Sequence, residues 1–416
     1  MGIETSCDET AAAVVEDGQR ILSNVVISQI DIFAEYGGVI PEVAARSHLE
    51  AIIPVVNKAL SSAKATWDDI DAIAVTHAPG LLGSLLIGTL TARTLAILHN
   101  KPLYAVHHLK SHVYANWLST EDHLDSFSDP TREDNSGLIL SDREKPVFPL
   151  VALVISGGHT QILYMRGHNK FEIVGTTHDD AIGECFDKVA KILGLPYPGG
   201  PSISKAANGD IRVSEAPHSG DKSQAASTES PRFASTPVSP GDALKYRLPH
   251  PKVDGLDFSF SGLKTAVLRA VQKEVGVPIS CPSHKLKELL TLQQICDFAA
   301  SFQKTAVDIL CEKIILALKQ YPDTKSLVVA GGVSANEALR KRIFELFPSE
   351  YNLDHSSESV GLNQSFIKTR AFFPDPKLSG DNGAMVAAAC YYEIKAGVKP
   401  VDPYALNIYP RISIEE

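Results

Sequence analysis

The first hundred residues alternate short apolar stretches with polar turns, and one longer stretch repeats its apolar positions every three or four residues. The short stretches are typical of strands, and the longer one has the spacing of a single helix face. The predicted elements are strands around Ile3 and at residues 11–15, 21–27, 70–75 and 103–106, with helices over 42–63 and from about Gly83. The pattern therefore predicts a three-stranded meander followed by helices and strands of one α/β unit.

The same order of elements then begins again. Predicted strands lie at residues 150–155, 161–165, 171–174 and 326–330, and predicted helices at 180–193, 289–318, 335–347 and 381–396. The repetition predicts a duplicated lobe, and helices on both faces of mixed sheets make the chain an α/β protein. A length of 416 residues also exceeds what one hydrophobic core usually supports.

Two segments interrupt this pattern. Residues 119–148 are acidic and poorly periodic, and residues 212–252 contain seven serines and six prolines. Such compositions bury little apolar surface, so we expect an acidic insertion and an exposed loop that folding does not require. The predicted organisation is a first lobe at 1–118, the insertion at 119–148, a second lobe at 149–380 and a C-terminal helix at 381–416 that returns to the first lobe.

The composition narrows the class of protein. Hydrophobic residues make up 44% of the chain and charged residues 21%, so we expect no membrane span, and the N-terminal residues show no secretory pattern. We therefore expect a cytoplasmic protein. The formal net charge of −10 argues against general affinity for nucleic acid, so any RNA would need a local basic face or a partner subunit.

Three polar loops follow predicted strands at comparable places. ISGGHT at residues 155–160 joins two strands of the second meander, and its glycines would let backbone amides approach an anion. A tight turn without function is the alternative. TSCDET at residues 5–10 occupies the equivalent turn of the first lobe, and AGGVSAN at residues 330–336 ends a buried strand. Facing loops of this kind could hold one nucleotide.

The run VHHLKSH offers a metal site. On a helix, His108 and His112 lie one turn apart on the same face, as two ligands of one metal require. Asp381, at the start of the last predicted helix, is the best candidate for a third ligand. The alternatives are that the histidines are ordinary surface or core residues and that Asp381 is the N-cap of its helix.

Taken together, these blocks resemble the bacterial tRNA threonylcarbamoyladenosine transferase family, TsaD. The blocks that carry the resemblance are IETSCDET, YGGVIPEVAARSH, HAPGLLGSLLIG, VHHLKSH, ISGGHT, FDKVAKILGLPYPGGP, LDFSFSGLKT, AGGVSAN and GDNGAM, in that order. The resemblance implies duplicated ribonuclease-H-like lobes of the actin/hexokinase/heat-shock ATPase superfamily. The older description of the family as an endopeptidase is disfavoured, because no glutamate stands between His108 and His112 as zinc protease motifs require.

The resemblance also implies roles for individual residues. His108, His112 and Asp381 would bind one divalent metal, iron or zinc, and Asp8 and Glu9 match an acidic pair of the family's first loop. Either of these acids could take a proton from the attacking amine. The residues expected to bind the substrate nucleotide are Val154, Ile155, Ser156, Gly157, Gly158, Asp187, Gly200 and Asn336.

The implied reaction transfers the threonylcarbamoyl group of threonylcarbamoyl-AMP to the exocyclic amine of an adenosine in tRNA. The acceptor would be the adenosine 3′ of the anticodon in tRNAs that read codons beginning with A. The implied partners are tRNA, a paralogous non-catalytic subunit and a small ATPase. A small-molecule kinase and an ATP-binding scaffold of the same superfamily stay open as alternatives, although a kinase would not need His108 and His112 beside the phosphates.

Overall fold

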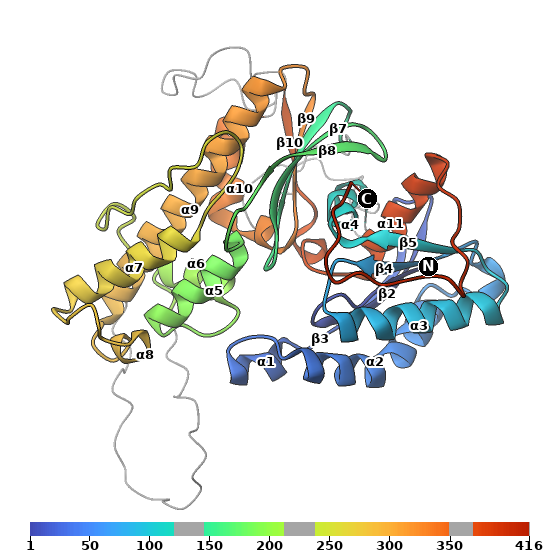
Figure 1. Cartoon of the computed structure of the whole chain (residues 1–416), viewed down its shortest axis with the longest axis horizontal. Coiled ribbons are helices and arrows are strands. Elements are labelled where there is room, and N and C mark those ends of the chain that lie inside the picture. The colour runs from blue at the N-terminus through green and yellow to red at the C-terminus, as the bar shows by residue number, and fades with distance from the viewer. Residues whose placement is uncertain (120–144, 212–237, 349–368, 416) are drawn as a thin grey trace, which may run out of the picture.

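The computed structural model describes residues 1–119, 145–211, 238–348 and 369–415, which form two lobes (Figure 1). The predicted insertion, apart from its ends, and the first part of the Ser/Pro-rich loop lie outside the described residues. Within the described ranges, no helix has both the length and the apolarity needed to cross a membrane.

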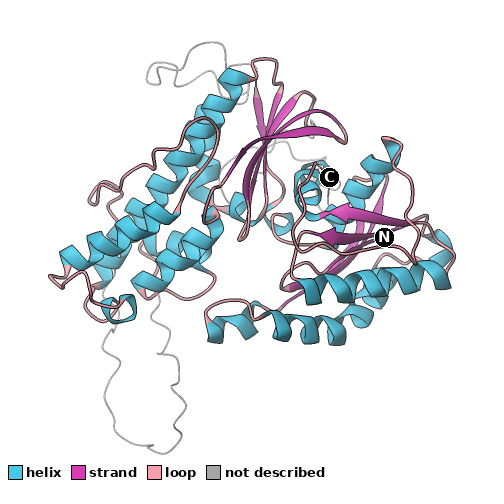
Figure 2. Cartoon of the chain, viewed as in Figure 1, coloured by secondary structure: helices cyan, strands magenta, loops and turns pink. Residues whose placement is uncertain are grey.

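The first lobe is built on a five-stranded sheet with the strand order β3-β2-β1-β4-β5. Its strands are β1 (Gly2–Glu4), β2 (Glu9–Glu16), β3 (Arg20–Ser28), β4 (Ile73–Ala78) and β5 (Leu103–His107). The first three form an antiparallel meander, and β4 and β5 run parallel to β1. Helices α2 (Pro41–Ser62) and α3 (Leu82–Leu98) pack their apolar residues on one face of this sheet (Figure 2).

The second sheet repeats this topology, with the order β10-β9-β6-β7-β8. Its strands are β6 (Leu150–Ile155), β7 (Thr160–Gly167), β8 (Lys170–Thr176), β9 (Ser326–Ala330) and β10 (Arg370–Phe372). Again the first three strands form an antiparallel meander and the last two run parallel to the first. The two identical topologies confirm the predicted α/β class with duplicated ribonuclease-H-like lobes.

Most helices of the second lobe cover the face of its sheet that points away from the first lobe (Figure 1). They are α5 (Ile182–Leu193), α6 (Gly199–Ala207), α7 (Ser261–Glu274), α9 (Leu292–Gln320) and α10 (Glu337–Leu346). The long helix α9 begins with a capping box, in which the Thr291 hydroxyl accepts from the Gln294 amide and the Gln294 side chain accepts in return.

Two helices lie between the sheets and join the lobes. Helices α4 (His108–Tyr114) and α11 (Gly383–Lys395) contribute to one apolar cluster that also contains Val106 of the first sheet and Ala152 and Val328 of the second. Helix α11 approaches β1 so closely that a Cβ atom on Gly2 would collide with the Gly383 carbonyl oxygen. The two lobes therefore share a continuous hydrophobic core.

Two predicted element boundaries were wrong for a local reason. The strand predicted from residue 70 begins at Ile73, because the capping box of Thr66 and Asp69 turns the chain just before it. The last helix, predicted from Asp381, begins at Gly383, because Asn382 is its N-cap.

The C-terminal segment after α11 crosses from the first lobe to the second. The Tyr409 amide donates to the His77 carbonyl oxygen at 3.0 Å, and the Gly80 amide donates to the Pro410 carbonyl oxygen at 3.2 Å. Near the end of the segment, the Glu415 carboxylate accepts from the Ile173 amide of β8 at 2.9 Å. This segment therefore runs along one side of the space between the lobes.

Residues 242–248 of the expected loop lie against α9, although Asp242, Leu244, Lys245 and Arg247 are exposed. The Tyr246 ring stacks on Phe298 of α9 with a centroid distance of 3.7 Å and an interplanar angle of 2°. The Lys245 ammonium lies 2.6 Å from the Asp297 carboxylate, and the Tyr246 amide donates to the Ser301 hydroxyl. Ala243, Tyr246 and Leu248 of this segment are partly buried against the core of the second lobe, which its serine and proline content did not indicate.

We predict that Tyr246→Ala lowers the free energy of unfolding by about 2 kcal/mol, because it removes a stacked ring from α9. Chemical denaturation of the full chain measures this change. Tyr246→Phe is the matched control and should retain most of the stability, because it keeps the ring. Equal stability of the alanine variant and the parent would show that the segment does not stabilise the fold.

Candidate active site

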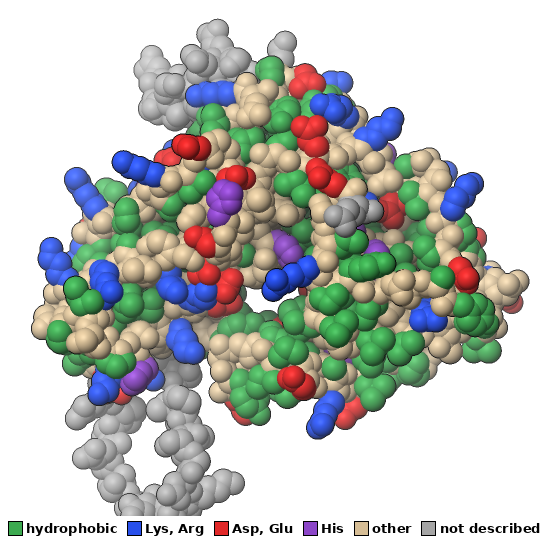
Figure 3. Space-filling model, viewed as in Figure 1, with side chains coloured by type: hydrophobic (Ala, Val, Ile, Leu, Met, Phe, Trp, Pro, Cys, Tyr) green, Lys and Arg blue, Asp and Glu red, His purple; other side chains and the backbone are tan. Residues whose placement is uncertain are grey.

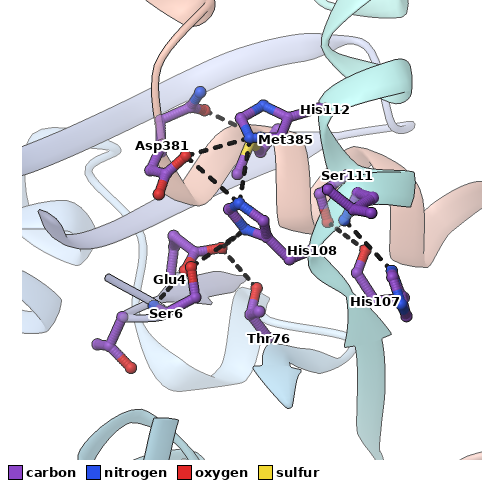
Figure 4. Close-up of polar contacts among 12 residues, drawn as sticks. Glu4, Ser6, Thr76, His107, His108, Ser111, His112, Asp381 and Met385 are labelled. Atoms are coloured by element: carbon purple, nitrogen blue, oxygen red, sulfur yellow. Dashed lines mark hydrogen bonds and ion pairs between the residues drawn. The ribbon is translucent and has the colours of Figure 1, made fainter. Parts of the chain in front are cut away.

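Three side chains from two helical regions converge between the lobes (Figure 4). Helix α4 begins directly after β5, because the His107 side chain accepts from the Leu109 amide and caps the helix. His108 and His112 therefore lie one turn apart, and their Nε2 atoms are separated by 3.2 Å. The Asp381 Oδ1 atom lies 3.2 Å from His112 Nε2 and 3.6 Å from His108 Nε2.

Asp381 is not used to cap its helix. The adjacent Asn382 accepts from the Met385 amide at 3.0 Å and donates to the Gly380 carbonyl oxygen at 2.8 Å. The sequence left open whether Asp381 is a ligand or an N-cap, and the structure assigns the cap to Asn382. The Asp381 carboxylate consequently points toward the two histidines.

The charges of this cluster suit a cation. Burial lowers the pKa of His108, but the negative charges of Asp381 and Glu4 outweigh it and raise the pKa to about 9. Burial raises the pKa of Asp381, but the charge of His108 and the hydrogen bond and charge of His112 lower it to about 2. Both pKa shifts mean that positive charge is stabilised next to the Asp381 carboxylate. A divalent cation bound between the side chains would supply such a charge. Two imidazoles and one carboxylate leave positions open for further ligands.

The acidic pair lies at the beginning of β2. Asp8 is buried, and the Glu9 carboxylate accepts from the Ser28 hydroxyl at 3.1 Å. Burial and the negative charges of Asp381 and Asp8 raise the pKa of Glu9 well above its usual range. Glu9 therefore has a higher affinity for a proton than an ordinary glutamate.

The glycine turn of the second lobe presents open backbone. A Cβ atom placed on Gly157 or Gly158 would meet no atom within 4 Å, and neither glycine has a positive φ. The turn itself is closed by Ser156, whose hydroxyl accepts from the His159 amide at 3.2 Å. Neither a steric contact within the chain nor the backbone conformation requires glycine at these two positions. The absence of side chains leaves free space in front of the backbone, which suits the close approach of a ligand. Val154 and Ile155 lie in β6, where they pair with β7, and their side chains are fully buried.

Asp187 of α5 and Gly200 of α6 belong to the second lobe, as the glycine turn does. Asp187 Oδ1 accepts from the Gly199 amide at 2.7 Å and so fixes the N-terminus of α6. Burial, assisted by the charges of Glu184 and Asp8, raises the pKa of Asp187 to about 6 against the opposing effect of this hydrogen bond. Gly200 has open space where a side chain would stand.

Asn336 is engaged within the second lobe. Its side-chain oxygen accepts from the Leu339 amide and caps α10, and its nitrogen donates to Ser204 Oγ at 3.1 Å and to Gln303 Oε1 at 3.0 Å. The Ser204 hydroxyl donates to Gln303 Oε1 at 2.7 Å. Asn336 thus joins α6, α9 and α10 around the loop that follows β9.

Sequence reasoning missed His159 and Glu4 as residues of the site. Burial and the positive charges of His108 and His112 lower the pKa of His159 to about 4, so this imidazole is neutral at neutral pH. His159 also lines a pocket of about 420 Å³ together with Leu109, Gln161 and residues 410–414. His159 belongs to the ISGGHT block, which was singled out for its glycines. Glu4 belongs to the IETSCDET block, which was singled out for Asp8 and Glu9.

The space-filling view shows a hollow between the two halves of the molecule, with histidine side chains at its wall (Figure 3). A pocket lined by Leu109 of the first lobe and His159 of the second lies between the lobes, and we call this space the interlobe cleft. The charges of His108 and His112 act on His159, so the three-residue cluster lies near the glycine turn of the second lobe.

Comparisons with known proteins identify related sequences. Residues 20–128 and 135–388 match the family described as TsaD: tRNA N6-adenosine threonylcarbamoyltransferase. A relative with that description from Symbiobacterium thermophilum is 42% identical over 400 residues, covering 96% of this chain and 92% of the relative. Another, from Staphylococcus saprophyticus, is 39% identical over 420 residues and covers 100% of this chain and 96% of the relative.

We predict that His108→Ala and His112→Ala each lower the amount of bound divalent metal, measured by elemental analysis of the purified protein. Asp381→Asn should do the same without destabilising α11, because Asn382 provides the cap. Asn382→Ala is the matched control and should cost about 1 kcal/mol of stability while leaving the three ligands in place. Metal content equal to the parent's in His112→Ala would contradict the proposed ligand set.

Proposed function

The chain belongs to the TsaD family of tRNA N6-adenosine threonylcarbamoyltransferases, and on this premise we propose that its interlobe cleft binds threonylcarbamoyl-AMP. It is a transferase that acts on tRNA, so a small-molecule kinase and an ATP-binding scaffold are not favoured. The acceptor that we propose is the adenosine 3′ of the anticodon in tRNAs that read codons beginning with A. The observation that carries the proposal is the convergence of His108, His112 and Asp381.

The proposed reaction is an acyl transfer from a mixed anhydride. The exocyclic amine of adenosine attacks the carbonyl carbon of the threonylcarbamoyl group, a C–N bond forms, and the bond from that carbon to the phosphate oxygen breaks. AMP leaves, and the amine loses one proton. The protein must therefore stabilise negative charge on the carbonyl and phosphate oxygens and must accept a proton.

His108, His112 and Asp381 are the residues that would hold a divalent metal, for which we propose iron or zinc. Two imidazole nitrogens and one carboxylate oxygen suit either ion. A metal bound there supplies Lewis acid stabilisation of charge on the substrate oxygens. The anionic surroundings, with Glu4 buried beside His108, support the binding of a cation rather than of a phosphate at these residues alone.

The glycine turn is the proposed site for the nucleotide of the donor. The open backbone at Gly157 and Gly158 supports close approach of a phosphate or ribose. We propose that Asp187 and Gly200 of the same lobe contact the same nucleotide, with Asn336 holding the loop after β9 in position. Ser156 can contribute through its side chain, whereas buried Val154 and Ile155 can contribute only through their backbone.

Glu9 is the proposed acceptor of the amine proton. The raised pKa of Glu9 gives its carboxylate a higher proton affinity than that of an unperturbed glutamate. Asp8 lies beside it, and the negative charge of Asp8 is one reason for that raised pKa. Asp8 therefore assists Glu9 electrostatically in this proposal.

We propose that the protein works in the cytoplasm with a paralogous non-catalytic subunit and a small ATPase. A large apolar surface on the first lobe supports a partner subunit there, because monomeric proteins rarely leave so many apolar side chains exposed together. The exposed residues on the outer faces of α2 and α3 are Leu49, Ile53, Leu82, Leu86 and Leu90. These residues repeat at helical spacing, which presents a continuous face to a helical partner.

Reconstitution tests the function. The full chain, supplied with threonine, bicarbonate, ATP, tRNA and the companion proteins, should produce threonylcarbamoyladenosine, detected by mass analysis of digested tRNA. His112→Ala should reduce the product at least 100-fold, because it removes one of the three proposed ligands of the metal. Absence of the product from the parent protein, when the companions are active with a known relative, would refute the proposal.

The pH dependence of transfer should identify the proton acceptor. A base must be deprotonated, so the rate should fall as the pH drops through the raised pKa of Glu9. Glu9→Gln should reduce the rate by roughly 10²- to 10⁴-fold and abolish this acidic limb. Asp8→Asn should retain activity at neutral pH and shift the limb to lower pH, since it removes a charge that raises the pKa of Glu9. The reverse pattern in the two variants would assign the base to Asp8.

A further inference from the structure

Glu4, the last residue of β1, is a carboxylate with no solvent exposure, and it lies behind the histidine cluster (Figure 4). Its Oε1 atom accepts from the Ser6 amide at 2.5 Å, and its Oε2 atom accepts from the Thr76 hydroxyl at 2.6 Å. The same Oε2 atom lies 3.2 Å from His108 Nδ1. A buried carboxylate needs several donors, and these three groups provide them.

The hydrogen bond from His108 has a consequence for the opposite side of its ring. A carboxylate beside His108 Nδ1 favours a proton on that nitrogen, so Nε2, which faces Asp381 and His112, is the ring nitrogen that would give up its proton to bind a metal. A carboxylate behind a ligating histidine fixes both its tautomer and the orientation of its ring.

We propose that Glu4 is a positioning residue that holds His108 in the tautomer and orientation needed to bind the metal. The inference rests on the proposed metal site and goes beyond its three ligands. The Ser6 hydroxyl lies 3.2 Å from the same Nδ1 atom and offers a second, weaker acceptor.

The two histidines differ in this respect. In the described part of the chain, His112 Nδ1 is buried and has no hydrogen-bond partner, whereas His108 Nδ1 faces Glu4. The orientation of His108 is therefore set by a carboxylate, and that of His112 is set by packing within α4 and the contact with Asp381. Loss of Glu4 should release the better oriented of the two nitrogen ligands.

Glu4 also joins the cluster to the acidic loop. Its bond to the Ser6 amide fixes the chain two residues before Asp8, and its bond to Thr76 ties the end of β1 to β4. One side chain thus relates the position of His108 to the loop that carries the acidic pair. A purely structural role for Glu4 would consist of these two bonds alone.

The test is the affinity of the full chain for zinc, measured by competition with a chelator in the absence of tRNA and donor. Glu4→Gln should weaken zinc binding roughly 10- to 100-fold, because its amide group cannot accept hydrogen bonds from all three donors. The absorption spectrum of the cobalt(II)-loaded variant should also differ from that of the parent. Since neither readout requires transfer, this inference can fail while the transferase proposal stands, and the reverse also holds.

Glu393→Gln is the matched control. Glu393 is a buried carboxylate of α11 that pairs with Lys110 at 3.5 Å, and its loss should leave zinc affinity unchanged. Thr76→Val should have a smaller effect than Glu4→Gln, because the bond between Glu4 and His108 is kept. Glu4→Asp, which retains the charge with a shorter reach, is measured alongside in case Glu4→Gln folds poorly. Parental zinc affinity in a folded Glu4 variant, with affinity lost in His108→Ala, would overturn the inference.

Discussion

The packing of α4 and α11 between the two sheets is the constraint on which the site depends. Apolar residues on these helices belong to the same cluster as residues of both sheets, so the position of each helix is fixed from two sides. His108 and His112 project from one helix, and Asp381 immediately precedes the other. The alignment of the three side chains is consequently a property of the hydrophobic core, and rigid elements of this kind hold ligands more accurately than loops do.

The cleft brings several acidic side chains close together. Burial and the charges of Asp381 and Asp8 raise the pKa of Glu9, and burial and the charges of Glu184 and Asp8 raise that of Asp187. Substrates of the proposed reaction are anionic as well. The acidic side chains would repel such substrates, so a bound cation and backbone amides would have to attract them. Open glycine backbone beside an acidic cluster is consistent with this need.

Much of the fold could be predicted because its signals are local. The two meanders, the long helix α9 and the buried strand β9 follow directly from apolar spacing, and all are confirmed. Element ends were less predictable, because one hydrogen bond from the Met385 amide to the Asn382 side chain decides where α11 begins. The docking of Tyr246 was missed, because composition does not report which distant ring a side chain meets. For the same reason, the spacing of His108 and His112 was visible in the sequence, whereas the contact of Glu4 with His108 joins residues 104 positions apart.

The close approach of α11 to β1 limits which sequences this architecture tolerates. Gly2 faces the Gly383 carbonyl oxygen, and a Cβ atom on Gly383 would in turn meet the backbone of Ala12 and Ala13. A methyl group at either glycine would push α11 away from the sheet and carry Asp381 away from the histidines. Glycines that carry no reactive group thus constrain the geometry of the site, and a mutational scan would find intolerant positions well outside the cleft.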